Sequence, residues 1–147
     1  MPAGAAEALL PARPPIAAPL DADLGDDVRL LGALVPAQAK PGESVTVTWT
    51  FEAKRRVPAG WRLFVHVKGP SNTYINADHK PARPFEWWQP GQFIRYSTTI
   101  TLPRHTPPGT YTVWVGMFRG HQRAPVRAPR VRVDNNALAA ATFEVVP

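Results

Sequence analysis

Residues 44–51 read SVTVTWTF, and this stretch decides the fold. Its apolar side chains alternate with hydroxyl side chains, so that Val45, Val47, Trp49 and Phe51 share one side of an extended chain. A period of two over this length is typical of a β-strand with one buried face. We therefore predict a strand whose apolar face packs on a core.

Further segments of the same kind lie on both sides of this strand. They are rich in Val, Ile, Thr and aromatic residues, and turns with proline and glycine separate them. Proline ends helices and is excluded from central strands, so the 18 prolines favour short strands joined by turns. The predicted strands, with a brief one at 131–133, span residues 28–34, 61–68, 92–102, 110–118 and 138–146. The pattern predicts an all-β fold, an antiparallel two-sheet sandwich of about seven to eight strands.

The chain divides by composition into an arm and a body. Residues 1–25 are rich in proline and alanine and predict an arm or linker, with at most a short helical turn at 5–10. Residues 26–147 predict the sandwich domain. Residues 1–27 hold five acids and one base, a net charge of about −4. Because the whole chain has a net charge of +6, residues 28–147 carry about +10. A basic body favours an anionic partner such as nucleic acid, anionic lipid or an acidic glycan, or is simply a soluble basic surface.

Several function classes lack their sequence signatures. The chain has no cysteine, which excludes disulfides, cysteine zinc sites and thiol nucleophiles. It contains no GxSxG, HExxH, Walker or dinucleotide-binding motif, and its acids are scattered among turns and strand ends. It also has no helix-turn-helix, zinc-finger or RNA-recognition signature. We predict neither an enzyme nor a specific nucleic-acid binder, and no cofactor or metal.

A set of short motifs carries a family resemblance over about residues 26–146. The motifs are DVRLLG at 27–32, FVHV at 64–67, Ala77-Asp78, Pro90-Gly91, PGTY at 108–111 and VGMF at 115–118. Their order resembles the soluble β-sandwich domain that follows the membrane region of bacterial multi-spanning glycosyltransferase-like proteins of the mannosyltransferase type. The resemblance implies an immunoglobulin-like or carbohydrate-binding-module-like fold without catalytic residues. It also implies a periplasmic or other extracytoplasmic location and association with a membrane protein.

The long irregular segment at 69–91 is the first candidate site, because loops of this length inside compact domains are often functional. Trp87 and Trp88 are adjacent, so in an extended chain one enters the core and the other faces outward. An exposed tryptophan is a platform for a sugar ring or a protein partner, with Arg83 and Glu86 as polar contacts beside it. The alternative is that both rings only anchor the loop.

His66 and Asp78 are the second candidate site. His66 lies in the middle of the 61–68 strand, on the side opposite Leu63, and is expected to reach Asp78 or His79 across the loop. The pair either binds a ligand or metal, or braces the loop through hydrogen bonds. Asp78 either accepts sugar hydroxyls or fixes a turn by accepting backbone N–H groups. The spacing fits no standard metal motif.

Two basic clusters and three further tryptophans complete the candidates. The clusters are able to hold carboxylate or phosphate groups, or they form a solvated edge that discourages aggregation. The tryptophans belong either to the core or to a concave face. The first basic cluster is Lys54, Arg55 and Arg56, and the second is Arg119, His121, Arg123, Arg127, Arg130 and Arg132. The three tryptophans are Trp49, Trp61 and Trp114.

Three functional hypotheses follow from these features. The first is a non-catalytic accessory domain that contacts a glycan or protein partner through the 69–91 loop. The second is a structural or assembly subunit whose arm docks on a neighbouring chain. The third, with the least support, is a metal-dependent enzyme that uses His66, Asp78 and His79.

Overall fold

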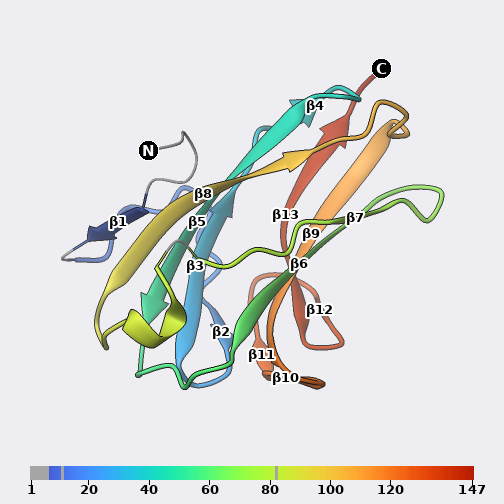
Figure 1. Cartoon of the computed structure of the whole chain (residues 1–147). Coiled ribbons are helices and arrows are strands. Elements are labelled where there is room, and N and C mark those ends of the chain that lie inside the picture. Colours follow the sequence, from blue (N-terminus) through green and yellow to red (C-terminus); the bar gives the residue numbers. More distant parts are fainter. Residues whose placement is uncertain (1–6, 11, 82) are drawn as a thin grey trace.

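The computed structural model describes residues 7–10, 12–81 and 83–147, and these form a β-sandwich. Thirteen strands lie in the described residues, and they form two sheets packed face to face (Figure 1). One 3-10 turn, η1 (Phe85–Trp87), interrupts the strands. In the residues described, no helix has the length and apolar character needed to cross a membrane. The predicted all-β two-sheet sandwich is confirmed.

The first sheet has the strand order β1-β8-β5-β3-β2-β11. Every neighbouring pair in it is antiparallel. Residues 44–51, with their alternating apolar side chains, lie in the inner strand β5. The six strands are β1 (Glu7–Leu10), β2 (Ala22–Leu24), β3 (Val28–Leu34), β5 (Ser44–Ala53), β8 (Phe93–Thr101) and β11 (Val126–Arg127).

The second sheet has the order β12-β13-β9-β6-β7, and two short strands join it from the side. β10 pairs with β9, and β4 pairs with β13 in the one parallel contact among the described strands. The strands are β4 (Gln38–Ala39), β6 (Arg62–Lys68), β7 (Tyr74–Asn76), β9 (Gly109–Arg119), β10 (Gln122–Arg123), β12 (Val133–Asp134) and β13 (Ala137–Val145). All six long predicted strands are present. The additional strands have two to four residues each, which is too short for alternation to identify them.

The core lies between the sheets and follows the predicted alternation. The apolar side chains of β5 and the facing side chains of β9 are almost entirely buried. Trp49 is the largest of them on β5, and its indole N–H donates to Thr98 Oγ1 at 2.9 Å. Tyr111 on β9 is also buried, and its hydroxyl donates to the Pro107 carbonyl at 2.7 Å. Each buried ring therefore keeps a partner for its polar atom.

The arm is built into the first sheet instead of hanging free. Residues 7–10, where we expected at most a helical turn, form β1 and pair antiparallel with β8 (Figure 1). β2 lies between β3 and β11, and Leu20, Ala22 and Leu24 are buried in the core. The predicted boundary between residues 25 and 26 thus falls inside the β2–β3 hairpin. Residues 1–6 and 11 of the predicted arm lie outside the described part of the chain.

An ion-pair cluster around Asp23 attaches the arm to the body. Asp23 Oδ1 accepts hydrogen bonds from Arg29 Nε at 2.9 Å and from Lys54 Nζ at 3.3 Å. Arg127 on β11 lies 3.9 Å from the other oxygen. Burial of Asp23 acts to raise its pKa, but the hydrogen bonds from Arg29 and Lys54 outweigh burial and lower the pKa below its usual value. The native state therefore favours the charged carboxylate.

Asp23→Asn is expected to lower the free energy of unfolding by roughly 1–3 kcal/mol at pH 7, because it removes the charged acceptor of the Arg29 and Lys54 hydrogen bonds. Since the folded pKa is lowered, this stabilisation is present above the unfolded pKa near 4 and is lost as the pH falls through the folded pKa. Urea unfolding at pH 7 and at the lowest pH that keeps the chain folded measures both effects. The matched control is Asp26→Asn, whose side chain is 72% exposed and whose loss costs no more than about 0.5 kcal/mol. A difference between wild type and Asp23→Asn that does not shrink at low pH would contradict the prediction.

Candidate functional site

The 69–91 segment divides its two tryptophans between core and solvent, as predicted. Trp88 is 0% exposed, packs on Phe85 and Phe51, and donates its indole N–H to the Arg83 carbonyl at 3.0 Å. Trp87 is 61% exposed. Trp88 therefore anchors the segment and presents no surface to a ligand, which corrects its place among the predicted contact residues. Trp87 is the exposed ring of the pair.

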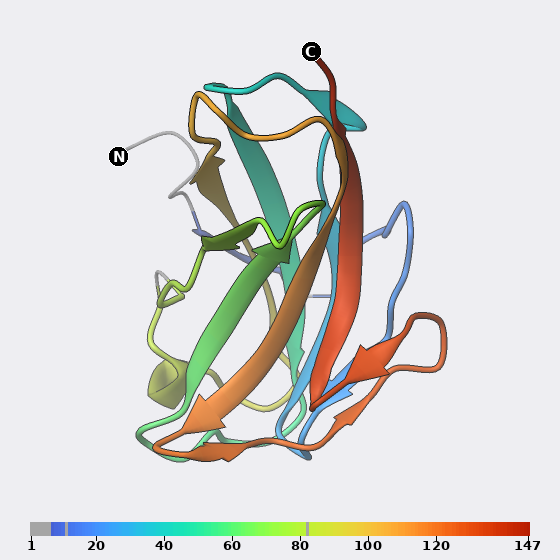
Figure 2. The same cartoon turned by 90° about the vertical axis from the view of Figure 1, so that its right-hand side faces the viewer.

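Arg83 and Glu86 lie beside these tryptophans. The Arg83 guanidinium carbon is 6.0 Å from the centre of the Trp87 ring, and Glu86 is exposed on η1. η1 lies at the β8 side of the molecule, away from the strands β10 and β12 (Figures 1 and 2). Glu86 and Phe85 of η1 line the first hollow described below, whereas Trp87 is not among its lining residues.

His66 and Asp78 come together as predicted. Their atoms Nε2 and Oδ1 are 3.6 Å apart, and the same Asp78 oxygen accepts the backbone N–H of Val65 at 2.7 Å. The Asp78 backbone N–H donates to Asn76 Oδ1 at 2.8 Å, so the carboxylate is held at the point where the chain leaves β7. Burial lowers the pKa of His66, and this outweighs the opposing effect of Asp78. The imidazole is therefore favoured in its neutral form at pH 7.

His79 points to the other side of the chain. Its Nε2 lies 2.7 Å from the Tyr96 hydroxyl, and its ring packs on Trp49 in the core. Burial lowers the pKa of His79 as well. His66 and His79 consequently do not share a site. Within the described ranges, no group of three or more His, Cys, Asp or Glu side chains is placed to hold a metal ion.

A row of hollows runs along β6, from the edge of the strand beside η1 onto the outer face of the second sheet. The first has a volume of about 480 Å³ and shares Arg62 and Lys80 with the second, of about 370 Å³. The second shares Asp78 and Phe118 with the third, of about 250 Å³. Adjoining hollows with common walls form a continuous depression.

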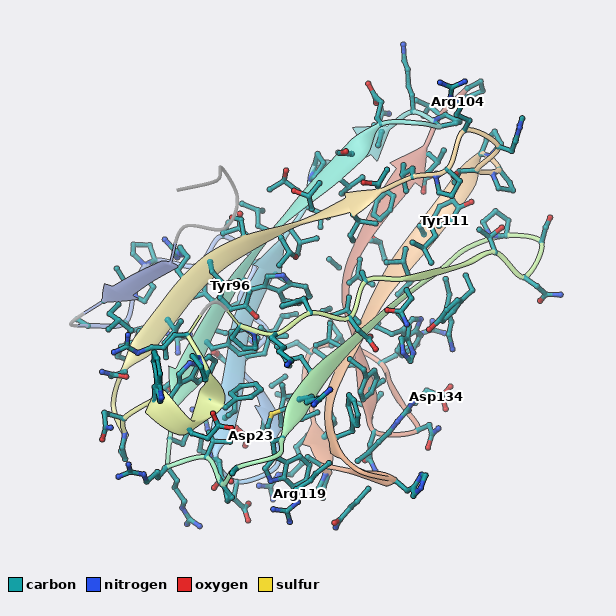
Figure 3. The ribbon with its side chains drawn as sticks, in the orientation of Figure 1. Asp23, Tyr96, Arg104, Tyr111, Arg119 and Asp134 are labelled. Carbon is teal, nitrogen blue, oxygen red and sulfur yellow. The ribbon has the colours of Figure 1, made fainter. Side chains whose placement is uncertain are left out.

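The row continues to a fourth hollow of about 110 Å³. The third and fourth share Phe64, His66 and Arg123, and the fourth ends at Trp114 and Asp134. We call the whole depression, from Trp61 to Asp134, the β6 groove. The second sheet faces the viewer in Figure 2, and Figure 3 labels Arg119 near the bottom of the molecule and Asp134 at its right-hand side.

Close strand packing makes the floor of the groove. Phe64 on β6 lies opposite Gly116 on β9, and its ring covers the glycine. A Cβ atom at position 116 would come within 2.3 Å of the Phe64 ring and 2.7 Å of the Asn136 carbonyl oxygen. Phe118 and His66 flank the Phe64 ring at 6.3 and 5.0 Å between ring centres. The ring thus lies flat on the sheet because the residue beneath it has no side chain.

The structure separates the predicted basic clusters. Lys54 and Arg127 belong to the Asp23 cluster, and Arg55, Arg56 and Arg130 are exposed. The remaining members border the β6 groove, and three of them stack on its rings. Of the three further tryptophans, Trp49 is in the core, and the half-buried Trp61 and Trp114 line the groove. The groove members are Arg119, His121, Arg123 and Arg132.

The groove itself was not predicted from the sequence. The alternation in the 61–68 strand placed Phe64 and His66 on one face, and the cluster at 119–132 was visible as a charge run. Nothing in the sequence indicated which arginine covers which ring. Comparison with known proteins adds no identity: no protein-family model matches the chain, and no curated protein matches it either.

Proposed function

We propose that the chain is a non-catalytic accessory domain that binds a linear glycan along the β6 groove. The observation that carries the proposal is the continuity of the groove: each hollow shares side chains with the next from Trp61 to Asp134. Pockets for a small molecule are enclosed and few, whereas an extended open depression accommodates successive units of a polymer.

The chemistry of the groove fits a saccharide. Carboxylates at three points along it are able to accept hydrogen bonds from hydroxyl groups, and guanidinium and imidazole groups are able to donate them. The half-buried Phe118 ring, between these polar groups, supplies apolar contact for the C–H face of a sugar. The carboxylates are Glu86, Asp78 and Asp134. Two of them belong to the 69–91 segment, so that segment takes part in the proposed contact, although Trp87 does not line these hollows.

An extracytoplasmic location and association with a glycosyltransferase-like membrane protein complete this proposal. They rest on the motif order described above, from FVHV at 64–67 to PGTY at 108–111. The rival proposal, assembly through the arm, has less support because the described part of the arm pairs within its own chain.

Phe118→Ala is expected to weaken binding to a linear polysaccharide by about tenfold, because Phe118 forms the wall between two hollows and one such contact contributes on the order of 1.4 kcal/mol. Affinity electrophoresis against a panel of soluble plant, bacterial and animal polysaccharides first identifies one that the wild-type chain binds. Titration calorimetry with that polysaccharide then measures the change.

Trp87→Ala is the matched control, since it removes a more exposed ring that lies outside the groove. Its affinity should equal that of the wild type. Loss of binding in Trp87→Ala with full binding in Phe118→Ala would move the site to the Trp87 surface. A wild-type chain that binds no polysaccharide in the panel would refute the proposed function.

A further inference from the structure

Three rings that border the β6 groove each carry a guanidinium group on their face. The Arg119 guanidinium carbon lies 4.8 Å from the centre of the Trp61 ring, and that of Arg132 lies 5.5 Å from the Trp114 ring. The Arg123 carbon lies 4.2 Å from the Phe64 ring. Stacking of this kind attracts the cation to the ring and fixes the plane of the guanidinium group. The N–H edges of a stacked guanidinium stay available for hydrogen bonds to a planar anion.

Arg123 is the central member of this set. It lines both the third and the fourth hollow, beside Phe64 and His66. Its Nη1 donates to the Asn135 carbonyl at 2.7 Å, which fixes the side chain at one end. In the part of the chain that the structure describes, no acid forms an ion pair with it. A guanidinium group has five N–H donors, so Arg123 retains donors for a ligand.

Cations outnumber acids along the groove. The hollows are lined by Arg62, Lys68, Lys80 and Arg123, and the stacked Arg119 and Arg132 add two more. Three acids, Glu86, Asp78 and Asp134, share the same walls. One Asp78 oxygen already accepts the Val65 N–H. The groove is therefore net positive with separate acceptor points.

From this arrangement we infer that the ligand is an acidic glycan, whose carboxylate or sulfate groups are bound by the ring-stacked arginines. This inference rests on the proposed function and specifies its ligand class. The acids of the groove are suited to accept hydrogen bonds from hydroxyl groups, which a sugar chain offers at every unit and a DNA phosphodiester chain does not. The arginines cover the ring faces on which unstacked bases would otherwise lie. Both features favour an acidic glycan over single-stranded nucleic acid.

The test compares probes that differ in charge but not in backbone. Polygalacturonate and its fully methyl-esterified form share one sugar chain, and chondroitin sulfate and unsulfated chondroitin form the matched sulfate pair. Oligothymidylate is the nucleic-acid probe. We expect the full chain to bind polygalacturonate or chondroitin sulfate at least tenfold more tightly than the matched chain without that group. The pair that shows the difference identifies the anion as carboxylate or sulfate.

Variants then locate the contact. Arg123→Gln is expected to weaken binding to the acidic probe about tenfold and to leave binding to the neutral methyl ester of polygalacturonate unchanged. Arg123→Lys keeps the charge without the planar fork and should give an intermediate affinity. Arg104→Gln is the control: it makes the same change in net charge at the opposite end of the molecule from Arg119 (Figure 3).

The outcomes separate the inference from the function on which it rests. Equal affinity for polygalacturonate and its neutral methyl ester, with no effect of Arg123→Gln, would overturn the acidic ligand and leave a neutral glycan as the ligand, provided that chondroitin sulfate also binds no more tightly than chondroitin, which keeps its glucuronate carboxylates. An equal loss in Arg123→Gln and Arg104→Gln would overturn the site, because only net charge would then matter. Tighter binding to oligothymidylate than to either acidic glycan would overturn the ligand class. Binding to none of the glycans would refute the proposed function together with the inference.

Discussion

Trp88→Ala is expected to lower the free energy of unfolding by about 3–5 kcal/mol, the usual cost of removing a buried tryptophan from a core. The side chain has no exposed surface and lies between Phe85 and Phe51, with ring centres at 4.7 and 5.5 Å. Its loss leaves a cavity that these rings are unable to fill without leaving their own contacts. It also removes the indole N–H group that donates a hydrogen bond to the Arg83 carbonyl.

Urea unfolding followed by circular dichroism measures this loss. The neighbouring variant Trp87→Ala is the control, because the same residue type is removed one position away at 61% exposure. We expect it to change the free energy of unfolding by no more than about 0.5 kcal/mol. Similar losses in the two variants would show that the segment does not divide its tryptophans between core and solvent.

Gly116→Ala is expected to lower the free energy of unfolding by about 1–3 kcal/mol, because the added methyl group enters a fully packed site. The Phe64 ring and the Asn136 carbonyl oxygen both lie too close to a Cβ atom at this position. The ring is expected to tilt away from the sheet, and Arg123 stacks on that ring. The variant should therefore also bind the acidic glycan more weakly than the wild type.

A double-mutant cycle with Phe64→Ala separates the ring from the other contact. If the Phe64 ring causes most of the clash, Gly116→Ala should cost at least about 0.5 kcal/mol less in the Phe64→Ala background than in the wild type. Strict additivity of the two losses would contradict the close approach of ring and glycine.

The central strands were predictable because their signal is local. The alternating apolar residues of β5 and of β9 all face the core, although Thr50 and Gly116 on the opposite faces are buried as well. The split between Trp87 and Trp88 was predicted from an extended chain, in which adjacent residues point to opposite sides. The structure shows the same split for another reason, because Trp87 ends the 3-10 turn η1. Which of the two is buried depends on η1 and on the Arg83 carbonyl, and neither is visible in the sequence.

The arm was predicted as a separate unit because composition outweighed a short pattern. Leu20, Ala22 and Leu24 alternate with Asp21 and Asp23, which is a strand signal of five residues. The prolines before it favoured a linker. Asp23 of this strand faces three cations supplied by other strands and by the segment after β5. Such compensation becomes visible only when distant segments are brought together.

The β6 groove was beyond sequence reasoning for the same reason. Its ring–guanidinium contacts join β6 and β9 to residues at 119–132, and its hollows depend on how β7 leaves part of β6 uncovered. Register determines these contacts, and alternation alone does not determine register between distant strands.

The five indole N–H signals of the chain offer the most direct measurement of glycan binding in the β6 groove. We predict that a two-dimensional ¹H–¹⁵N spectrum, recorded during titration with oligogalacturonate or a chondroitin sulfate oligosaccharide, shows shifts of the Trp61 and Trp114 signals. The signals of Trp49 and Trp88, which are buried, and of Trp87, which lies outside the groove, should stay in place. A shift of the Trp87 signal alone, or no shift of any indole signal at saturating oligosaccharide, would contradict the account.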